Sequence, residues 1–265
     1  MADTNALEKA ERIQKVLARG GLGSRREIER WIEEGRLNVN GVKVTLGLHL
    51  HPGDQVQLNG RIIKWEKYIS QPTRVIVYNK PTGEVVTRRD PQGRPVVFTR
   101  LPKLDIGRWI SVGRLDINTS GLLLLTNNGE LANRLMHPSA EVDREYAVRI
   151  LGDVPEEMIE QLKTGVTLDD GEAHFEDIQF FSGEGANKWF HVVVKEGRNR
   201  LVRRLWESQG VTVSRLMRVR YGPAILPGNV RAHDYYELNN KEIAILQEFV
   251  GLKAEKSLKP ALKQR

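Results

Sequence analysis

The spacing of apolar residues divides the chain into a short helical beginning and a long, strand-rich remainder. Residues 13–17 place their apolar side chains on one helical face, and Gly20 ends that pattern. Ser24 then starts a second helix, and Glu27 three residues later completes a capping box. Short alternating segments separated by turns follow. The pattern therefore predicts a compact module of two helices and a few strands over residues 12–64.

Beyond residue 74, the alternation of apolar and polar residues predicts strands that follow one another with few helices between them. Consecutive strands without regular crossover helices favour a mainly antiparallel, mixed sheet over a doubly wound one. The predicted fold class is therefore α+β, with a large sheet domain and a small N-terminal α/β domain. The expected strands are residues 74–78, 84–87, 122–126, 144–150, 173–181, 188–195 and 212–221, and the expected helices are residues 130–136, 155–163, 199–209 and 239–250.

Changes in composition mark the expected domain boundaries. Residues 65–73 are predicted to link the N-terminal module to a large domain at residues 74–250. The Lys-rich segment 251–265 is predicted to be a disordered basic tail. We expect a monomer in which the small domain hangs on a mobile tether.

The excess of positive charge is concentrated in two segments of the chain. The net charge is +7, and residues 194–221 carry eight Lys or Arg against two Glu. Residues 251–265 carry five Lys or Arg against one Glu. The rest of the chain is therefore slightly acidic. Positive charge gathered in this way is typical of a surface that follows nucleic-acid phosphates.

Composition also excludes several kinds of chemistry. The chain has no cysteine, which excludes disulfides, thiol catalysis and cysteine-ligated zinc. Only His49 and His51 lie close together among the histidines, in a turn without an acidic cluster nearby, so no metal site is expected. The longest apolar run, residues 122–125, is far shorter than the roughly 20 residues that cross a bilayer. Since the N-terminus also lacks an apolar signal core, a cytoplasmic protein without membrane contact is predicted.

The most informative segment is residues 113–126, where an acid lies in a polar loop just before a buried strand. Gly113 and Gly121 on either side let the backbone bend and let a ligand approach closely. An aspartate such as Asp116 in a loop of this kind most often accepts backbone N–H groups. A catalytic carboxylate would occupy the same kind of position, so the pattern by itself leaves both interpretations open.

Five segments along the chain together resemble the motifs of the RsuA-type pseudouridine synthases. Residues 113–126 are similar to the family's signature loop, Gly-Arg-Leu-Asp-x-x-Thr-Ser-Gly-Leu-Leu-Leu. Residues 80–83, 144–148 and 196–206 resemble the family's Lys-Pro-x-Gly turn and its second and third motifs. Residues 12–64 resemble the small RNA-binding domain named after ribosomal protein S-four. The third motif is closest to the large-subunit branch of the family, so the implied substrate is a uridine of large-subunit (23S) ribosomal RNA.

The resemblance implies a role for each of three side chains. Asp116 is the implied catalytic carboxylate, Tyr146 the ring that stacks on the target uracil, and Arg203 the basic partner of Asp116. An opposite charge nearby keeps a desolvated carboxylate ionised. If residues 199–209 are helical, Arg200 and Arg204 lie on the same side as Arg203 and face phosphates. The full set of expected RNA-binding residues is Lys15, Arg19, Arg25, Arg26, Arg30, Lys80, Arg114, Arg198, Arg200 and Arg204.

Each of these assignments has a structural alternative. Tyr146 alternates with Val148 and Ile150, a pattern that is equally typical of a core position. The basic residues of the first two helices could form a solvated surface, because three nearby glutamates partly cancel them. The three arginines near residue 203 could all bind phosphate only. Lys80 could simply support its turn.

The implied reaction breaks the C1′–N1 bond of a uridine, turns the base and joins C1′ to C5. It involves no redox step and no group donor, so no cofactor is expected. It requires one ionised carboxylate beside the ribose and base, and the base must leave its stack to be reached. Asp116 could attack C1′, attack C6 or remove the C2′ proton, and the sequence does not distinguish these routes.

Other functions fit part of the pattern. A non-enzymatic RNA-binding or ribosome-assembly protein would need the same charge distribution and N-terminal module, and a paralogue would modify a different ribosomal RNA site. A glycoside hydrolase would need a second carboxylate on the other side of the scissile bond. No second acid lies in a loop comparable with that of Asp116, which argues against the hydrolase.

Overall fold

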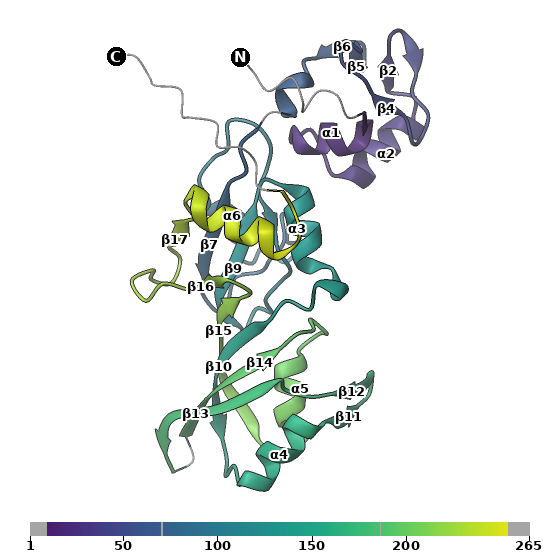
Figure 1. Ribbon diagram of the computed structural model, residues 1–265. Helices are drawn as coiled ribbons and strands as arrows, with labels where there is room; N and C mark the ends of the chain where they lie inside the picture. The colour runs from purple at the N-terminus through teal and green to yellow at the C-terminus, as the bar shows by residue number, and fades with distance from the viewer. Residues whose placement is uncertain (1–9, 70, 186, 254–265) are drawn as a thin grey trace, which may run out of the picture.

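The computed structural model describes residues 10–69, 71–185 and 187–253, which form a small N-terminal part and a larger, elongated part (Figure 1). In the N-terminal part, α1 (Ile13–Arg19) and α2 (Arg25–Glu33) share one apolar core with a four-stranded antiparallel sheet. The predicted capping box between Ser24 and Glu27 is confirmed at the start of α2. The sheet order is β3 (Val42–Lys43), β2 (Leu37–Val39), β5 (Val56–Leu58) and β6 (Arg61–Ile63), and β1 (Glu11–Arg12) pairs separately with β4 (His49–Leu50).

The N-terminal core extends beyond the boundary expected at residue 64. Trp65 and Tyr68 are buried among the apolar residues of this part. Trp65 directly precedes a short 3-10 helix, η2 (Glu66–Tyr68), and Tyr68 is its last residue. The Trp65 indole also donates a hydrogen bond to the Asp54 carbonyl at 2.8 Å. The linker expected at residues 65–73 therefore begins only after Tyr68, because two aromatic side chains in this mostly polar stretch belong to the core.

The larger part is built on one nine-stranded sheet that continues from one end of it to the other (Figure 1). Among the described strands only the pairing of β15 with β9 is parallel, which confirms the predicted α+β class with a mainly antiparallel, mixed sheet. The order is β13 (Asp177–Glu184), β14 (Asn187–Val194), β10 (Arg144–Leu151), β15 (Thr212–Tyr221), β9 (Ser120–Thr126), β7 (Val75–Lys80) and β17 (Tyr235–Glu237), with β16 (Ala224–Ile225) beside β15 and β8 (Ile110–Ser111) beside β9.

Helices and loops bury this sheet in separate clusters. Side chains of β7 and β9 alternate between two of them: one includes α3 (Gly129–Met136) and α6 (Asn240–Phe249), and the other includes residues of the loops before β9. The run of leucines at 122–125 is consequently buried on both faces. In the other half, α4 (Glu156–Thr164) and α5 (Leu201–Glu207) pack against β10, β13, β14 and β15.

Most expected elements of the larger part are present within a few residues of their predicted bounds, and two strands differ. The strand expected at 84–87 is reduced to a single bridge between Val85 and Val96. The strand expected at 173–181 is divided between β13 and a separate hairpin of β11 (Val166–Leu168) and β12 (Gly171–Ala173). The Asp-Asp-Gly sequence at 169–171 supplies the turn of that hairpin.

The tail expected at 251–265 lies almost entirely outside the described residues. Of its first residues, Leu252 packs against the cluster formed with α3 and α6, and its N–H donates to Gln247 at 2.8 Å. None of the helices within the described ranges is long and apolar enough to cross a membrane.

Candidate active site

Four consecutive backbone carbonyls in the loop before β9 accept hydrogen bonds from other parts of the chain. This segment, residues 113–119, is called the aspartate loop below. The bonds run from Lys80 Nζ to the carbonyls of Asp116 (3.1 Å) and Thr119 (2.9 Å), from the Gly83 N–H to Ile117 (2.8 Å) and from Arg203 Nη2 to Asn118 (3.0 Å). Such a loop is fixed before any substrate arrives, as a catalytic group requires.

Lys80, at the end of β7, is completely buried. Its ammonium group also donates to the Pro81 carbonyl at 2.9 Å, so it has three carbonyl acceptors in all. Burial lowers the pKa of Lys80 to about 8, and the carboxylates of Glu84 and Asp116 oppose this shift. The RNA contact expected of Lys80 is not available to a side chain in this position. Lys80 instead supports both its own turn and the aspartate loop.

Lys80→Met should therefore destabilise the protein and weaken its activity together. Three carbonyls would each lose the Lys80 donor, which we expect to lower the free energy of unfolding by about 1–3 kcal/mol. Urea denaturation and turnover measurements check this, with Lys103→Met at an exposed position as the control. Unchanged stability and turnover in Lys80→Met would contradict the supporting role.

The start of β9, directly after the aspartate loop, lies against β15, and the two strands run parallel there. Gly121 pairs with Arg218 and has a φ of +96°, and a Cβ built on it would lie 2.2 Å from the Arg218 carbonyl oxygen. Only glycine permits this approach. Gly121 therefore brings the loop next to β15, whose other neighbour is β10 with Tyr146.

The Asp116 carboxylate itself is partly exposed and, among the described residues, has no hydrogen bond or ion pair. The usual role of a loop aspartate, to accept backbone N–H groups, is therefore not observed for this side chain. Its loop is held entirely through carbonyls, which leaves both carboxylate oxygens free for a substrate. In the described ranges no group of three or more His, Asp or Glu side chains is placed to hold a metal ion.

Arg203 lies close to the aspartate loop, but its contacts differ from those expected. The helix α5 begins at Leu201, so Arg200 is its N-cap, with a φ of 51°, and does not share a helical face with Arg203. The buried Arg203 guanidinium donates to the carbonyls of Asn118 at 3.0 Å and Val213 at 2.8 Å, and it forms no ion pair with Asp116. Burial and the charge of Arg200 lower the pKa of Arg203, whereas Glu207 and Asp116 raise it. Arg203 thus contacts the backbone of the aspartate loop, and its charge interacts with Asp116 without an ion pair.

Tyr146 occupies the junction between the two halves of the sheet. Val148 and Ile150 are completely buried in the cluster around α5, as the alternation predicts. Tyr146, on the same side of β10, is only partly buried and packs against both this cluster and the one that contains Leu115 of the aspartate loop. The ring therefore lies where the two core clusters meet and is partly open to solvent.

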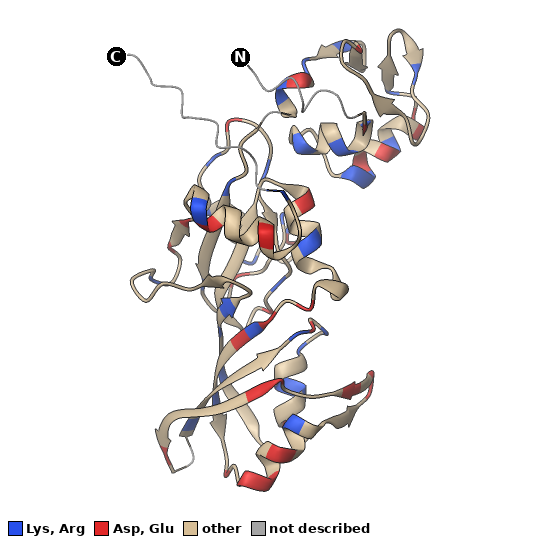
Figure 2. Ribbon diagram, viewed as in Figure 1, with Lys and Arg blue, Asp and Glu red and all other residues tan. Residues whose placement is uncertain are grey.

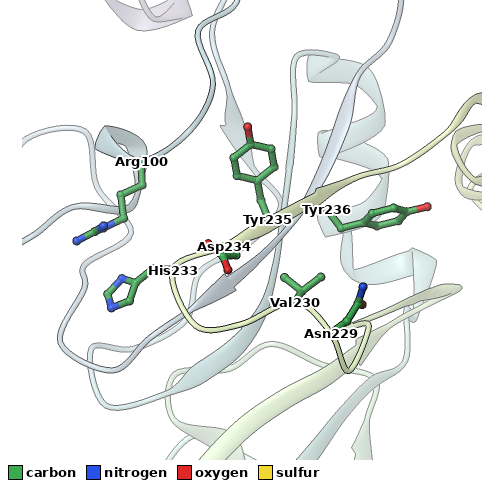
Figure 3. A pocket seen from close by; sticks show the side chains of 7 residues that line it. All are labelled: Arg100, Asn229, Val230, His233, Asp234, Tyr235 and Tyr236. Carbon is green, nitrogen blue, oxygen red and sulfur yellow. The ribbon is translucent and has the colours of Figure 1, made fainter.

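A buried acid that the sequence did not single out lies behind the Lys-Pro-x-Gly turn. Glu84 is 2% exposed and accepts hydrogen bonds from the Tyr78 hydroxyl at 2.7 Å and Arg100 Nε at 3.1 Å. The His233 ring nitrogen Nδ1 is 3.2 Å from the same carboxylate. Arg100 and His233 lie side by side at the edge of a polar cavity of about 550 Å³ (Figure 3). A glutamate directly after the turn was the only available signal in the sequence.

The arginines around α5 divide into two groups. Arg204 holds Asp170 in the β11–β12 hairpin through two bonds of 2.7 and 2.9 Å, and Arg198 bonds to Asp170 and Glu196. These contacts tie α5 to the hairpin, which differs from the phosphate contacts expected of both residues. Arg200 is exposed and has only a 3.6 Å contact with Glu207. Of the three, Arg200 is the one available to a phosphate.

Arg200→Gln should therefore weaken RNA binding more than Arg204→Gln does. We expect the slope of log affinity against log salt to fall by about 1 for the Arg200 variant, because each phosphate contact releases about one counterion. The Arg204 variant should keep the wild-type slope. Binding titrations over a range of salt concentrations check this, and equal slopes for the two variants would contradict the division.

The remaining expected RNA-binding residues lie on exposed or partly exposed surfaces. Arg114 is exposed within the aspartate loop. On α1, Lys15 and Arg19 pair with Glu11 at 3.4 and 2.7 Å, and on α2 only Arg30 has an acidic neighbour, Glu34 at 3.6 Å. Arg25 and Arg26 are exposed and, within the described residues, have no ion pair. Figure 2 shows blue segments on both helices.

Comparison with known proteins identifies the family and the fold. Residues 74–208 match the model of the family described as RNA pseudouridylate synthase, and residues 11–56 match the S4 domain. The chain is 60% identical over 244 residues to a protein of Pseudomonas aeruginosa named ribosomal large subunit pseudouridine synthase B. That alignment covers 92% of this chain and 63% of the relative.

Other relatives with the same name are matched over more of their length. The protein of Pasteurella multocida is 54% identical, with 95% of this chain and 73% of the relative covered. The protein of Salmonella typhi is 53% identical, with 96% and 88% covered. Among solved structures, a pseudouridylate synthase superposes with a TM-score of 0.62 at 23% identity, over 89% of this chain and 99% of that chain, which shows a shared fold.

Proposed function

Because the chain belongs to the RNA pseudouridylate synthase family, we propose that it isomerises a uridine of large-subunit ribosomal RNA to pseudouridine, with Asp116 as the catalytic carboxylate. The names of its relatives support the RNA class, and their identities of 53 to 60% support the large-subunit branch. The enzyme would act as a cytoplasmic monomer, without a membrane and without a cofactor.

The single observation that carries this proposal is the state of the aspartate loop. Its four carbonyls at residues 116–119 are all occupied, whereas the Asp116 carboxylate has no described partner. A structural aspartate would show the opposite arrangement, with its carboxylate occupied. A rigid backbone that presents a free carboxylate suits a group that must meet the ribose and base of a bound nucleotide.

In the proposed reaction the target uridine leaves its helix and its base rests against Tyr146. Extrusion of a base costs a few kcal/mol, and stacking on an aromatic ring returns about 1–3 kcal/mol of this. Arg203 and Lys80 position Asp116 through its loop and bring two positive charges close to its carboxylate. The C1′–N1 bond then breaks, the base turns and C5 bonds to C1′. C5 loses its proton and N1 gains one, so the product is an isomer of the substrate.

The proposal is tested by mapping pseudouridine in ribosomal RNA from cells with and without the gene. We expect one large-subunit position to lose the modification in the deletion strain and to regain it when the purified protein is added to the RNA. Release of free uracil would instead indicate a hydrolase. An unchanged map, together with tight RNA binding by the protein, would indicate a non-enzymatic ribosome-assembly function.

A further inference from the structure

A cleft separates the N-terminal part from the sheet domain at the level of α3. Its volume is about 280 Å³, and it is lined from one side by Lys15, Arg19 and Arg25 of α1 and α2. From the other side it is lined by Arg108, just before β8, and by Glu130 near the start of α3. The helices α1 and α2 lie beside this end of the sheet domain in Figure 1. Four cationic side chains thus share a small space with one carboxylate.

Two of the four cations lack an acidic partner. Glu11 and Glu130 lie within 3.6 Å of Lys15, and Glu11 also holds Arg19 at 2.7 Å. Arg25 and Arg108 form no ion pair with any residue of the described ranges. These two guanidinium groups come from different domains and line the same cleft, so a single anion could contact both.

The guanidinium group of Arg108 is partly buried and has no acidic partner among the described residues. It is only partly exposed, and its Nε is buried without a hydrogen bond among the described atoms. Burial lowers the pKa of Arg108, and the Glu27 carboxylate opposes this only from a distance greater than an ion pair. A partly desolvated guanidinium without a counter-charge gains more from an anion than a solvated one does, because its interaction is screened less.

Contacts across the domain interface are few without such an anion. Ile106 packs against the N-terminal core, and Gly21 meets Gly107, where a Cβ on Gly107 would lie 2.8 Å from the Arg19 carbonyl. The 3.6 Å contact of Lys15 with Glu130 is the one ion pair that crosses the interface in the part of the chain that the structure describes. These few contacts place the small domain against the larger part, and the mobile tether stays a prediction.

We propose that this cleft binds a phosphate group of the substrate RNA between Arg25 and Arg108, so that the RNA itself closes the domain interface. The inference rests on the proposed function for the identity of the RNA. Guanidinium groups recognise phosphate through paired N–H donors, which fixes orientation as well as affinity. The aspartate loop precedes β9, and the cleft lies at the other end of this strand. Seven residues at about 3.3 Å each separate the two sites by roughly 20 Å. The bound phosphate would therefore belong to a nucleotide distant from the target uridine.

The first test measures the affinity of the full-length protein for a large-subunit ribosomal RNA fragment that carries the target uridine. Arg25→Gln and Arg108→Gln should each lower the affinity about tenfold and the salt slope by about 1. The double variant should lose less than the product of the two single losses, because both residues hold one phosphate. Arg61→Gln, at an exposed position outside the cleft, is the matched control and should bind as the wild type does. Melting temperatures verify that all variants fold.

The second test measures the distance between the domains. Because the chain has no cysteine, single cysteines at Lys43 and Lys241 can carry a fluorescent donor and acceptor. The RNA fragment should narrow the distance distribution in the wild type and not in the double variant, and inorganic phosphate at the same concentration should have no effect. An equal response to inorganic phosphate would indicate a simple anion site and would overturn the RNA assignment.

Wild-type affinity and salt slope in Arg108→Gln would also overturn the proposal. A failure of the cleft proposal can be distinguished from a failure of the proposed enzymatic function. If the two arginines contribute to RNA binding but no pseudouridine is formed, only the enzyme assignment fails. If pseudouridine is formed and Arg108→Gln has the wild-type KM, only the cleft assignment fails.

Discussion

Asp116→Asn should lower pseudouridine formation by at least about 10³-fold while RNA affinity stays within a factor of about two. The substitution keeps the size of the side chain and removes its charge, and a loss of 10³ corresponds to about 4 kcal/mol of transition-state stabilisation. The loop should remain in place, because it is held through backbone carbonyls and not through the carboxylate. Single-turnover assays and binding titrations on the same RNA fragment measure both quantities.

Asp105→Asn, at an exposed position outside the aspartate loop, is the matched control and should keep full activity. Stability provides a second control, since Asp116→Asn should melt at the wild-type temperature. A variant that retained a tenth of the wild-type rate would exclude Asp116 as the catalytic carboxylate, whatever the family resemblance implies.

Tyr146→Leu should lower turnover by about 10²-fold, whereas Tyr146→Phe should keep most of it. Stacking of a base on an aromatic ring is worth about 1–3 kcal/mol, and leucine offers no flat surface for it. The hydroxyl has no hydrogen-bond partner among the described residues, so its removal should matter little. Turnover of both variants under single-turnover conditions checks the prediction.

The two Tyr146 variants also separate stacking from packing. Both replacements are apolar, and Tyr146 borders two core clusters. If the role of Tyr146 is packing, a variant that loses activity should also have a lower melting temperature. Equal turnover of the Leu and Phe variants would remove Tyr146 from the mechanism, and a loss that follows stability alone would assign it to the core.

Periodicity and turn residues predicted the fold class and nearly all helices, because these depend on local pattern. The capping box at Ser24 and the buried leucines at 122–125 are examples. What could not be predicted depends on distant contacts. The parallel pairing at Gly121 joins segments 97 residues apart, and nothing local in the sequence of β9 indicates which strand will lie beside it.

For the candidate site, the sequence indicated which residues to consider but not how their side chains are placed. The resemblance selected Asp116, Tyr146 and Arg203, and the structure brings their segments together around β15. It could not indicate that Lys80 is buried or that Arg203 holds a carbonyl instead of the carboxylate, because those contacts depend on side-chain direction. Arg204 was assigned to phosphate on charge alone, and charge does not reveal that Asp170 is its neighbour.

The continuous sheet has a mechanical consequence for the encounter with RNA. Hydrogen-bonded strands run without a break from β13 to β17, and the aspartate loop and Tyr146 both border the middle of that sheet. The hydrogen bonds of this sheet oppose a motion in which the two walls of the site swing together over a nucleotide as the lobes of a clamp do. The shape change must therefore fall on the RNA, and we expect sites with weakly paired or looped uridines to be modified fastest.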